Sequence, residues 1–391
     1  MNYILFDNFR RNYLLPLTFT RPIAEIRFGI LTIREKWEKY LKSQISYLTE
    51  SYLSEKYPTI KQEDNVLING SICPNKDLIK EIAGLKPNEA LVDDSIVIAL
   101  RLTAEELNNI DGEPCGECEI PTKSKYLKLN NTWDIFELNH LAIEEDFKLL
   151  TEGRKSAPLS STNTVFNPEN VFIEEGAIVE CSILNASKGP IYIGKNTEVM
   201  EGSKIRGSFA LCEGSVLKMD SKIYGATTIG PHSKVGGEIG NSVILGYSNK
   251  AHDGYMGNSV IGEWCNLGAD TNTSNLKNTY EDVRLWSYPD QTFVNTHTQF
   301  CGLIMGDHSK SGINTMFNTG TVVGVNANVF GAGYQRNFIP SFSWPGMPSY
   351  NMNKAFKVAK AVYERRGKDF DKKEQDILKH IYMLTINNKR I

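Results

Sequence analysis

The sequence predicts an α/β domain over residues 1–155, a parallel β-helix of six-residue repeats over residues 156–345, and a helical segment over residues 346–391. Three observations predict this order. Glycine is concentrated in the middle of the chain, an aliphatic residue recurs there every six positions, and the C-terminal residues have helical amphipathic periodicity. A chain of 391 residues is long enough for two or three such parts, each with its own core.

The first part has few glycines and mixes two kinds of periodicity. Short apolar runs bounded by polar residues occur at residues 3–6, 66–68 and 96–100, and such runs are typical of buried strands in an α/β sheet. Amphipathic stretches at residues 30–40 and 133–150 predict helices. We therefore expect a small α/β domain before residue 155.

The second part has a period of six. Of the 31 glycines, 24 lie between Gly176 and Gly346, where the backbone must turn often. The aliphatic positions are Ile193, Val199, Ile205, Leu211, Leu217, Ile223, Ile229 and Val235, and the period resumes at Ile261, Leu267, Met305, Ser311, Phe317, Val323 and Val329. Short strands joined by tight turns produce this period, whereas the turns of a β-sandwich come at irregular intervals of about 8–12 residues. The pattern favours a parallel β-helix.

Two interruptions of the period lead to further expectations. Between Val235 and Ile261 the spacing is not a multiple of six, so the coil there should bulge or slip. The polar, non-repeating stretch over residues 273–303 should protrude as a loop. Beyond the β-helix, amphipathic patterns predict helices over residues 353–366 and 371–385.

Charge and composition exclude several classes of function. The 43 basic and 46 acidic side chains give a net charge of −3, which argues against binding nucleic acid or an acidic membrane through bulk charge. No apolar run reaches the roughly 20 residues of a membrane helix, and the N-terminal apolar stretch precedes its arginines, the reverse of a secretory signal. Seven scattered cysteines favour a reducing cytoplasm, and the single C-x-x-C of Cys115 and Cys118 is weak evidence for zinc.

One histidine lies in the irregular stretch, and irregular backbone on a rigid scaffold is a favoured place for function. It is His252, in the segment K-A-H-D-G-Y over residues 250–255, with Glu238 before it and Asn266 and Asn275 after it. These residue types, at these spacings, resemble the bifunctional N-acetylglucosamine-1-phosphate uridyltransferase and glucosamine-1-phosphate N-acetyltransferase family of hexapeptide-repeat acyltransferases. The resemblance covers the whole β-helix and is closest to the variant of Bacteroides-like bacteria, which has a shortened first domain.

The resemblance implies a left-handed β-helix that transfers an acetyl group from acetyl-CoA to the amine of a hexosamine 1-phosphate. It implies that His252 is the catalytic base and that Glu238 orients it. An ammonium group cannot attack a thioester, so a group such as imidazole must accept its proton. The carboxylate would fix the imidazole tautomer. In this family acetyl-CoA lies between neighbouring subunits, so a homotrimer is expected, with no nucleic-acid or membrane partner.

Further site residues follow from the same resemblance. Gly240 stands where the better-known family has a phosphate-contacting lysine, and Leu276 stands where it has a tyrosine, so some sugar-phosphate contacts must be rebuilt. The substrate-binding residues are expected to be Tyr255, Asn266 and Asn275, with Lys222, Lys250 and Arg284 as replacements for the lost contacts. The wall of the acetyl-CoA site is expected to include Ala269, Thr296 and Thr319.

The first domain carries a weaker resemblance. Residues 15–22 read L-P-L-T-F-T-R-P and resemble the P-L-T-x-x-x-P-K signature of sugar-nucleotide pyrophosphorylases. The stretch before the signature lacks glycine, Ile23 replaces the signature's lysine, and Ser71 stands where an aspartate normally holds magnesium. Three arginines could take the place of the glycine-rich phosphate cradle, and three aspartates are weak Mg²⁺ candidates. These residues are Arg10, Arg11 and Arg21, and Asp7, Asp93 and Asp94.

The sequence leaves the role of the first domain open. It is either a divergent nucleotidyltransferase that uses UTP or dTTP, or a retained domain without activity. Two alternatives for the whole chain also stay open. The chain could be a sugar-1-phosphate nucleotidyltransferase with a structural β-helix, or a non-catalytic trimer that binds a sugar phosphate.

Overall fold

The computed structural model describes residues 1–386 except 111, 113, 115, 117 and 348, so the Cys115–Cys118 pair lies partly outside the described residues. The chain divides into two compact units. Unit 1 comprises residues 1–14, 20–26 and 31–131, and unit 2 comprises residues 15–19, 27–30 and 132–391. Among the described residues, none of the helices has both the length and the apolar character that crossing a membrane requires.

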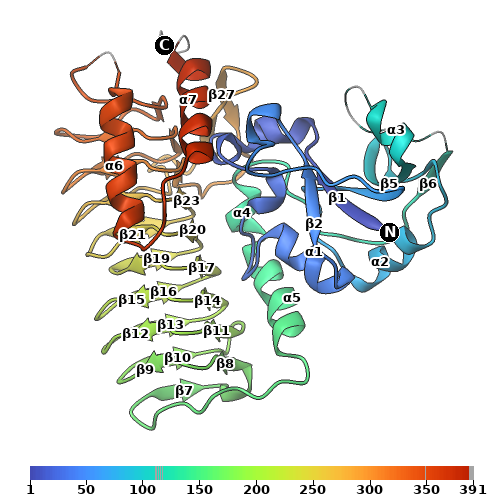
Figure 1. The fold of residues 1–391 in the computed structure, drawn as a ribbon. Coiled ribbons are helices and arrows are strands. Elements are labelled where there is room, and N and C mark those ends of the chain that lie inside the picture. Colours follow the sequence, from blue (N-terminus) through green and yellow to red (C-terminus); the bar gives the residue numbers. More distant parts are fainter. Residues whose placement is uncertain (111, 113, 115, 117, 348, 387–391) are drawn as a thin grey trace. The chain divides into compact units, whose positions relative to one another are not determined.

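Unit 1 is built on a six-stranded mixed sheet with the order β2-β1-β3-β5-β4-β6 (Figure 1). Its strands are β1 (Asn2–Phe6), β2 (Ile45–Leu48), β3 (Asp64–Asn69), β4 (Glu89–Asp93), β5 (Ile96–Thr103) and β6 (Cys118–Pro121). Its helices are α1 (Ile33–Leu41), α2 (Lys76–Ala83) and α3 (Ala104–Asn108), with short 3₁₀ turns η1 (Phe9–Leu14), η3 (Ile23–Glu25) and η4 (Ser51–Leu53). β1 runs parallel to both β2 and β3, whereas β5 is antiparallel to β3 and β4. The predicted α/β domain is confirmed.

The capping and packing of α1 illustrate why this unit folds as it does. Thr32 and Glu35 form a capping box that satisfies the first free N–H groups of the helix. Trp37 is fully buried, and its indole N–H donates to the Ile72 carbonyl at 2.8 Å. The helix therefore starts and docks where its sequence specifies.

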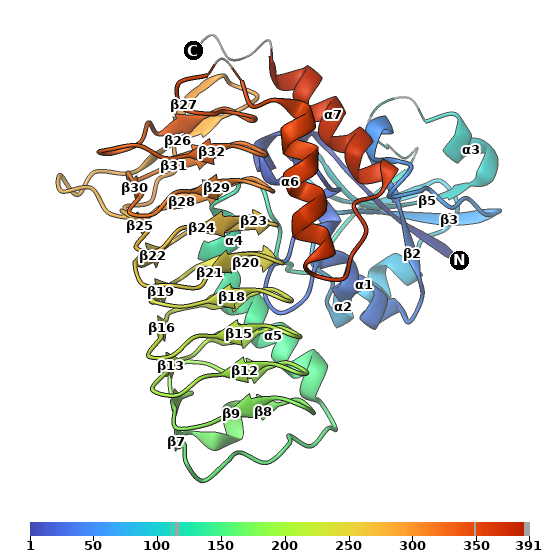
Figure 2. The same cartoon turned by 60° about the vertical axis from the view of Figure 1, so that its left-hand side comes forward.

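Unit 2 is a parallel β-helix of three long sheets, which we call faces 1, 2 and 3 (Figures 1 and 2). Face 1 contains β7 (Thr164–Phe166), β10 (Ile183–Asn185), β13 (Lys204–Arg206), β16 (Lys222–Tyr224), β19 (Glu238–Gly240) and β22 (Tyr255–Gly257), and the pair β25 (Asn272–Thr273) and β30 (Met316–Phe317) forms a further small sheet. Face 2 contains β8 (Val171–Ile173), β11 (Ile191–Ile193), β14 (Phe209–Leu211), β17 (Thr227–Ile229), β20 (Val243–Gly246), β23 (Val260–Glu263), β28 (Leu303–Met305), β31 (Thr321–Val323) and β33 (Phe338–Ile339). Face 3 contains β9 (Ile178–Val179), β12 (Glu198–Val199), β15 (Val216–Leu217), β18 (Lys234–Val235), β21 (Asn249–Lys250), β24 (Asn266–Leu267), β29 (Lys310–Ser311) and β32 (Asn328–Val329).

The interior of the β-helix explains the six-residue period. The predicted periodic positions are all buried. Strands of face 2 add a second interior residue two positions earlier, as Ile191 does before Ile193. The space between three sheets is narrow, so few residue types other than apolar ones fit. The parallel β-helix is confirmed; its left-handedness stays a prediction from the resemblance.

The irregular stretch that the sequence marked is a contraction of the coil. In the regular part Ile191 pairs with Phe209, and Phe209 pairs with Thr227, at a constant step along the chain. Thr228 instead pairs with Val243, and Val243 pairs with Val260, and both of these steps are shorter. Two successive turns of the β-helix therefore contain fewer residues than the regular turns. The irregular stretch is thus a shortening and not a bulge.

The predicted protrusion over residues 273–303 is confirmed. Val260 pairs with Ile304, so this one turn of the β-helix is far longer than its neighbours. The extra chain contains the antiparallel hairpin of β26 (Arg284–Ser287) and β27 (Thr292–Asn295).

The helices of unit 2 lie along the β-helix. Face 2 is covered by α5 (Asn139–Thr151), which follows α4 (Asp134–Glu137); Ile143 packs against Phe172, Tyr192 and Ala210. This packing groups residues 133–150 with the β-helix, although the sequence placed them in the first domain. The two predicted C-terminal helices are present as α6 (Met352–Glu364) and α7 (Lys372–Ile386), and α6 runs along the coils in both views (Figures 1 and 2).

Candidate functional site

The candidate site lies at the corner where the chain passes from face 3 to face 1. In the regular coil this corner comprises residues 218–221, and in the coil that carries His252 it comprises residues 251–254. In the contracted coil between them it comprises only Gly236 and Gly237. The shorter corner leaves a recess, and the following corner, which carries His252, lies beside that recess.

Glycine is required at the recessed corner. A Cβ atom at Gly237, whose φ is +82°, would lie 2.8 Å from the Gly254 carbonyl oxygen and 3.1 Å from that of His252. A Cβ atom at Gly236 would lie 2.7 Å from the Ala251 carbonyl oxygen. Because these neighbours are backbone atoms, any side chain here would push the corner that carries His252 out of place.

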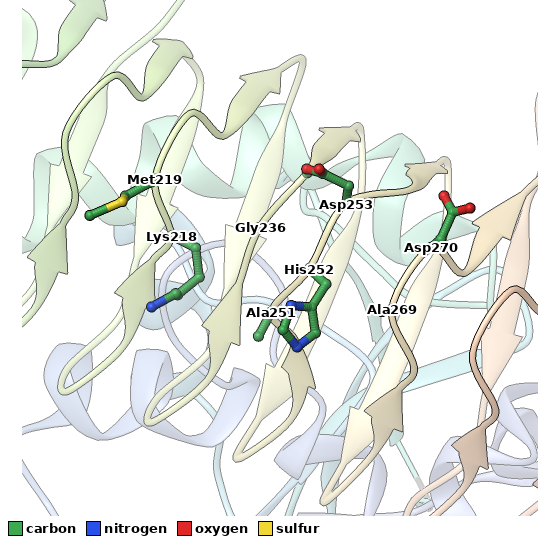
Figure 3. Close-up of a pocket in the computed structure, with 9 residues that line it drawn as sticks. Lys218, Met219, Gly236, Ala251, His252, Asp253, Ala269 and Asp270 are labelled. Carbon is green, nitrogen blue, oxygen red and sulfur yellow. The ribbon is translucent and has the colours of Figure 1, made fainter.

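The recess forms an open cavity of about 530 Å³. It is lined by Lys218, Met219, Gly236, Gly237, Ala251, His252, Asp253, Ala269 and Asp270. Figure 3 shows the side chains of Lys218 and His252 on one side of the corner and the carboxylates of Asp253 and Asp270 on the other. A bound molecule at this corner would therefore meet the imidazole and an amine together.

The His252 side chain is exposed to the cavity. Within the described part of the chain, its ring nitrogens have no hydrogen-bond partner. Glu238, which was expected to orient it, instead accepts a hydrogen bond from the Tyr224 hydroxyl at 2.6 Å and lies 3.8 Å from the Lys222 amine. The carboxylate on β19 and the imidazole on the following corner thus have no hydrogen bond to each other among the described residues.

A polar cluster covers face 1 beside the recess, and we call it the tyrosine cluster. It consists of Lys222, Tyr224, Glu238, Tyr255, Asn258 and Asn275. The Asn275 amide donates to the Tyr255 hydroxyl at 3.0 Å and to Asn258 Oδ1 at 2.8 Å. Burial, followed by the hydrogen bond to Glu238, raises the pKa of Tyr224, and burial raises that of Tyr255. Both phenols therefore stay protonated and able to donate.

Two glycines make room for the tyrosine rings. A Cβ atom at Gly240 would lie 3.0 Å from Tyr224 Cε2, and one at Gly257 would lie 2.3 Å from the Tyr255 hydroxyl. Gly240 is the position at which the resembled family has a lysine. The Tyr224 ring therefore lies over the glycine, where a side chain at residue 240 would meet it.

Lys250 differs from its expected role as a substrate contact. It pairs in register with the inward residue Val235 and is only 2% exposed. Its amine donates to the carbonyl oxygens of His252 at 2.9 Å, Gly236 at 3.2 Å and Asp253 at 3.3 Å. The structure therefore places this lysine behind the site and not on its surface.

The remaining expected residues of the acetyl-transfer site are spread over a larger area. Ala269 lines the cavity, and the exposed Asn266 lies on face 3 with its Oδ1 3.5 Å from the Asn249 amide. Arg284 lies on the protruding hairpin, where it donates to the Phe293 carbonyl. Thr296 and Thr319 are buried; the Thr296 hydroxyl donates to the Val283 carbonyl and the Thr319 hydroxyl bonds Ser274. Neither threonine is among the residues that line the cavity.

Sequence reasoning missed Lys218, Tyr224 and Asn258. For Lys218 a signal existed, because it follows the periodic residue Leu217 and so occupies the same corner as His252. For Tyr224 and Asn258 there was none, because their roles depend on rings and amides that meet across neighbouring coils.

Unit 1 has a cavity of its own, of about 850 Å³, at the carboxyl ends of β1 and β2. Asp7 and Asn8 follow β1, and Thr49 and Glu50 follow β2. The carboxyl ends of parallel strands are the usual place for ligands in α/β sheets. Arg11 also lines this cavity.

Asp7 and Arg11 are already paired with each other. Arg11 Nη1 lies 2.9 Å from Asp7 Oδ2, and Asp7 also accepts from the Thr49 hydroxyl at 2.5 Å and the Ile23 N–H at 2.8 Å. Burial raises the pKa of Asp7, against the opposing effect of Arg11. Arg11 further donates to the Arg21 carbonyl and the Tyr52 hydroxyl. Of the three expected arginines, only Arg11 thus lines the cavity.

The other nucleotide candidates lie apart from this cavity. Arg21 is buried, and the Arg10 guanidinium lies over the rings of Phe9 and Tyr13 at 4.7 Å and 5.3 Å. Asp93 ends β4, which is separated from β1 by β3 and β5, and Asp94 follows it in the hairpin turn.

Asp93 and Ser71 have partners within unit 1. Asp93 accepts a hydrogen bond from Tyr126, and Ser71 is fully buried and bonded to Asn69. Over the described residues, no three His, Cys, Asp or Glu side chains are grouped so as to hold a metal ion. A Mg²⁺ ion in this unit would therefore need ligands from a bound nucleotide or from water beside Asp7, the expected aspartate that lines the cavity.

The fold and the site together define a class, a hexapeptide-repeat protein in which an α/β unit accompanies a parallel β-helix with a histidine-bearing corner. Residues 3–155 match the family model described as sugar nucleotidyl transferase. The chain is 27% identical over 290 residues to the Bifunctional protein GlmU of Methanococcus vannielii, covering 68% of this chain and 60% of that protein. It is 31% identical over 221 residues to the protein of the same name from Methanocaldococcus jannaschii, covering 52% and 45%.

A third relative bears a name that states two activities. It is the Bifunctional sugar-1-phosphate nucleotidylyltransferase/acetyltransferase of Sulfurisphaera tokodaii, 24% identical over 207 residues, covering 52% of this chain and 45% of that protein. The chain therefore spans roughly half the length of these relatives. The chain is thus similar to GlmU-like proteins, and its residues 3–155 match a sugar nucleotidyl transferase model.

Proposed function

We propose that unit 2 transfers an acetyl group from acetyl-CoA to the amine of a hexosamine 1-phosphate, with glucosamine 1-phosphate as the first acceptor to test. The observation that carries this proposal is the exposed His252 beside the recessed corner, next to the tyrosine cluster. The names of the relatives support it, since one of them includes acetyltransferase. The identities of the acetyl acceptor and of the acetyl donor are both part of the proposal.

His252 acts as the proton acceptor. The neutral amine forms a bond to the thioester carbonyl carbon while one of its protons passes to the imidazole. The C–S bond then breaks, and the imidazolium gives that proton to the departing sulfur, so that CoA leaves as the thiol. General-base catalysis by an imidazole contributes roughly 10²–10⁴-fold. Because no acyl-enzyme forms, no nucleophilic side chain is needed.

The tyrosine cluster binds and orients the sugar. Glu238 supplies an acceptor and the Tyr255 phenol a donor for hydroxyl groups, and Asn275, whose amide donates to the Tyr255 oxygen, holds that phenol on face 1. Lys222, on the same face, and Lys218, in the cavity, supply positive charge for the phosphate. Glu238 thus acts on the sugar, since Tyr224 and Lys222 already hold its carboxylate.

Acetyl-CoA approaches from the side of Ala269 and Asp270, which line the cavity on the coil after His252. The small Ala269 leaves room there for the thioester. Asn266, exposed on face 3, faces a neighbouring copy of the chain in a homotrimer, as the resemblance implies. This arrangement would complete the donor site with a second subunit.

The test is release of free thiol from acetyl-CoA with a panel of amino-sugar phosphates. Glucosamine 1-phosphate should give acetyl-dependent thiol release, and glucosamine 6-phosphate and glucosamine serve as controls for the position of the phosphate. Absence of release with every acceptor, together with retained sugar-phosphate binding by calorimetry, would instead favour a non-catalytic binding protein.

We propose a second activity for unit 1, uridylyl transfer to N-acetylglucosamine 1-phosphate. The specific observation is the cavity at the ends of β1 and β2 within a segment that matches sugar nucleotidyl transferases. The test incubates the full chain with N-acetylglucosamine 1-phosphate, each nucleoside triphosphate and Mg²⁺, and measures pyrophosphate. Release of pyrophosphate with UTP supports the proposal. Release with dTTP would instead make thymidine the preferred nucleoside, and no release with any nucleotide would leave unit 1 with a structural or regulatory role.

A further inference from the structure

We propose that Lys250 is a positioning residue that holds the His252 corner in place from inside the β-helix. Its interior location is the first observation. Along face 3 the inward residues of successive coils are Val199, Leu217 and Val235, and the next position in register is Lys250. A lysine with 2% exposure in a column of aliphatic residues needs a compensating set of partners.

The partners belong to two corners. The amine donates to the Gly236 carbonyl in the recessed corner and to the His252 and Asp253 carbonyls in the corner after it. An ammonium has three N–H donors, and these three oxygens match that number. Lys250 therefore ties the recessed corner to the residue that the proposed function uses as the base.

The lysine lies where the coil contracts. The corner before Glu238 has only Gly236 and Gly237, and the Gly236 carbonyl accepts from the Lys250 amine together with two carbonyls of the following corner. Buried carbonyls without a donor are costly, on the order of 1–3 kcal/mol each. Burial is the main influence on the lysine and lowers its pKa to about 8, whereas Asp253 and Asp270 act in the opposite direction.

The catalytic consequence rests on the proposed acetyl transfer, whereas the structural consequence does not. Replacing the ammonium by an apolar chain leaves the His252 carbonyl without this donor, so the corner gains freedom. A displacement of about 1 Å at a reacting group can cost on the order of 10²-fold in rate. Lys250→Met should therefore lower kcat by roughly 10–100-fold while the KM for acetyl-CoA changes by less than about threefold.

The matched control is Val199→Ala, which weakens the same inward column three coils earlier and does not touch the cavity. Both variants should lower the melting temperature. Only Lys250→Met should change kcat and shift the NMR signal of the His252 ring and its titration midpoint. Lys250→Arg should recover part of kcat, because a guanidinium can still donate to inward carbonyls.

Two results would overturn the proposal. One is a Lys250→Met variant whose kcat, His252 signal and His252 titration match those of Val199→Ala. The other uses the unaltered protein: acetic anhydride labelling followed by mass spectrometry should modify Lys218 and spare Lys250, and equal labelling of both would contradict the buried contacts. If the chain shows no acetyl transfer at all, the ring signal and the labelling still decide the role of Lys250.

Discussion

The regular and the contracted coils of the same β-helix differ in what their corners can do. In the regular coils the register is constant, so each corner lies on a corner of the same length, as in the coils where Ile191 pairs with Phe209. In the contracted coils the corners no longer match in length, and a cavity opens where Gly236 and Gly237 replace a longer corner. A solenoid thus gains a concave site by deletion, without any added loop.

The substitution with the largest expected effect removes the imidazole. His252→Ala should lower acetyl transfer by about a hundredfold or more, because the amine loses its proton acceptor. Binding of acetyl-CoA, measured by calorimetry, should stay near that of the unaltered chain. His232→Ala is the control, since His232 lies at another corner of the β-helix against the Tyr247 ring. Near-normal turnover of His252→Ala would contradict this role and make Asp253 the next candidate for the proton acceptor.

The second test fills the recess. Gly237→Ala adds a Cβ atom at positive φ within 3.1 Å of three backbone atoms of the His252 corner, so it should lower both activity, by tenfold or more, and the melting temperature. Gly153→Ala has a similar φ of +71° but no atom within 4 Å of the added Cβ. It should therefore show the cost of the left-handed backbone alone, about 1–2 kcal/mol, with unchanged activity. If the two substitutions had equal effects on activity and melting temperature, the recess would have no role in activity.

The third test concerns the tyrosine cluster. Glu238→Gln keeps an acceptor for the Tyr224 hydroxyl and loses the attraction to Lys222, so activity should fall only several-fold, mainly through a higher KM for the sugar. Tyr224→Phe should give a similar, mild effect. A loss as large as that of His252→Ala, without a change in KM, would show that Glu238 acts directly on the imidazole.

These results bear on how much the sequence could predict. The inward positions such as Ile193 and Val235 were predictable, because the narrow β-helix interior accepts mainly apolar residues at regular intervals. The place of the contraction was predictable from the broken period. Its direction was not, because the period restarts at Ile261 whether residues are added or lost in between.

The site was less predictable than the fold. Lys250 looks like a surface cation in the sequence, and only the register shows that it points inward beside Val235. Glu238 has the expected position, but its partners Tyr224 and Lys222 come from the preceding coil, which spacing within one segment cannot reveal. In unit 1, Arg11 was expected to bind phosphate, and the sequence did not reveal that its guanidinium is paired with Asp7.

The last expected effect is a pH dependence of stability, which leaves activity unaltered. The pKa of Lys250 is about 8 in the folded protein and 10.5 for an ordinary lysine, so between these values the unfolded chain holds one more proton. Stability should therefore rise with pH over this window, by up to about 3 kcal/mol, and be independent of this group below pH 8. Urea unfolding at pH 7.5 and pH 10 should show this rise, and Lys250→Met should lack it. An equal rise in the variant would assign the effect to other groups.

The aromatic stack at another corner of the β-helix has an optical consequence. Trp264 is stacked on Tyr363 of α6 with ring centroids 3.9 Å apart, and on Tyr247 at 4.4 Å. The ring centroids of His308 and Tyr363 are 6.0 Å apart, and the two rings are nearly parallel. An indole in such close contact with other rings emits differently from one in water, so its fluorescence reports whether α6 is docked. The protein thus carries an internal reporter for the attachment of its C-terminal helix, readable by subtracting the emission of Trp264→Phe.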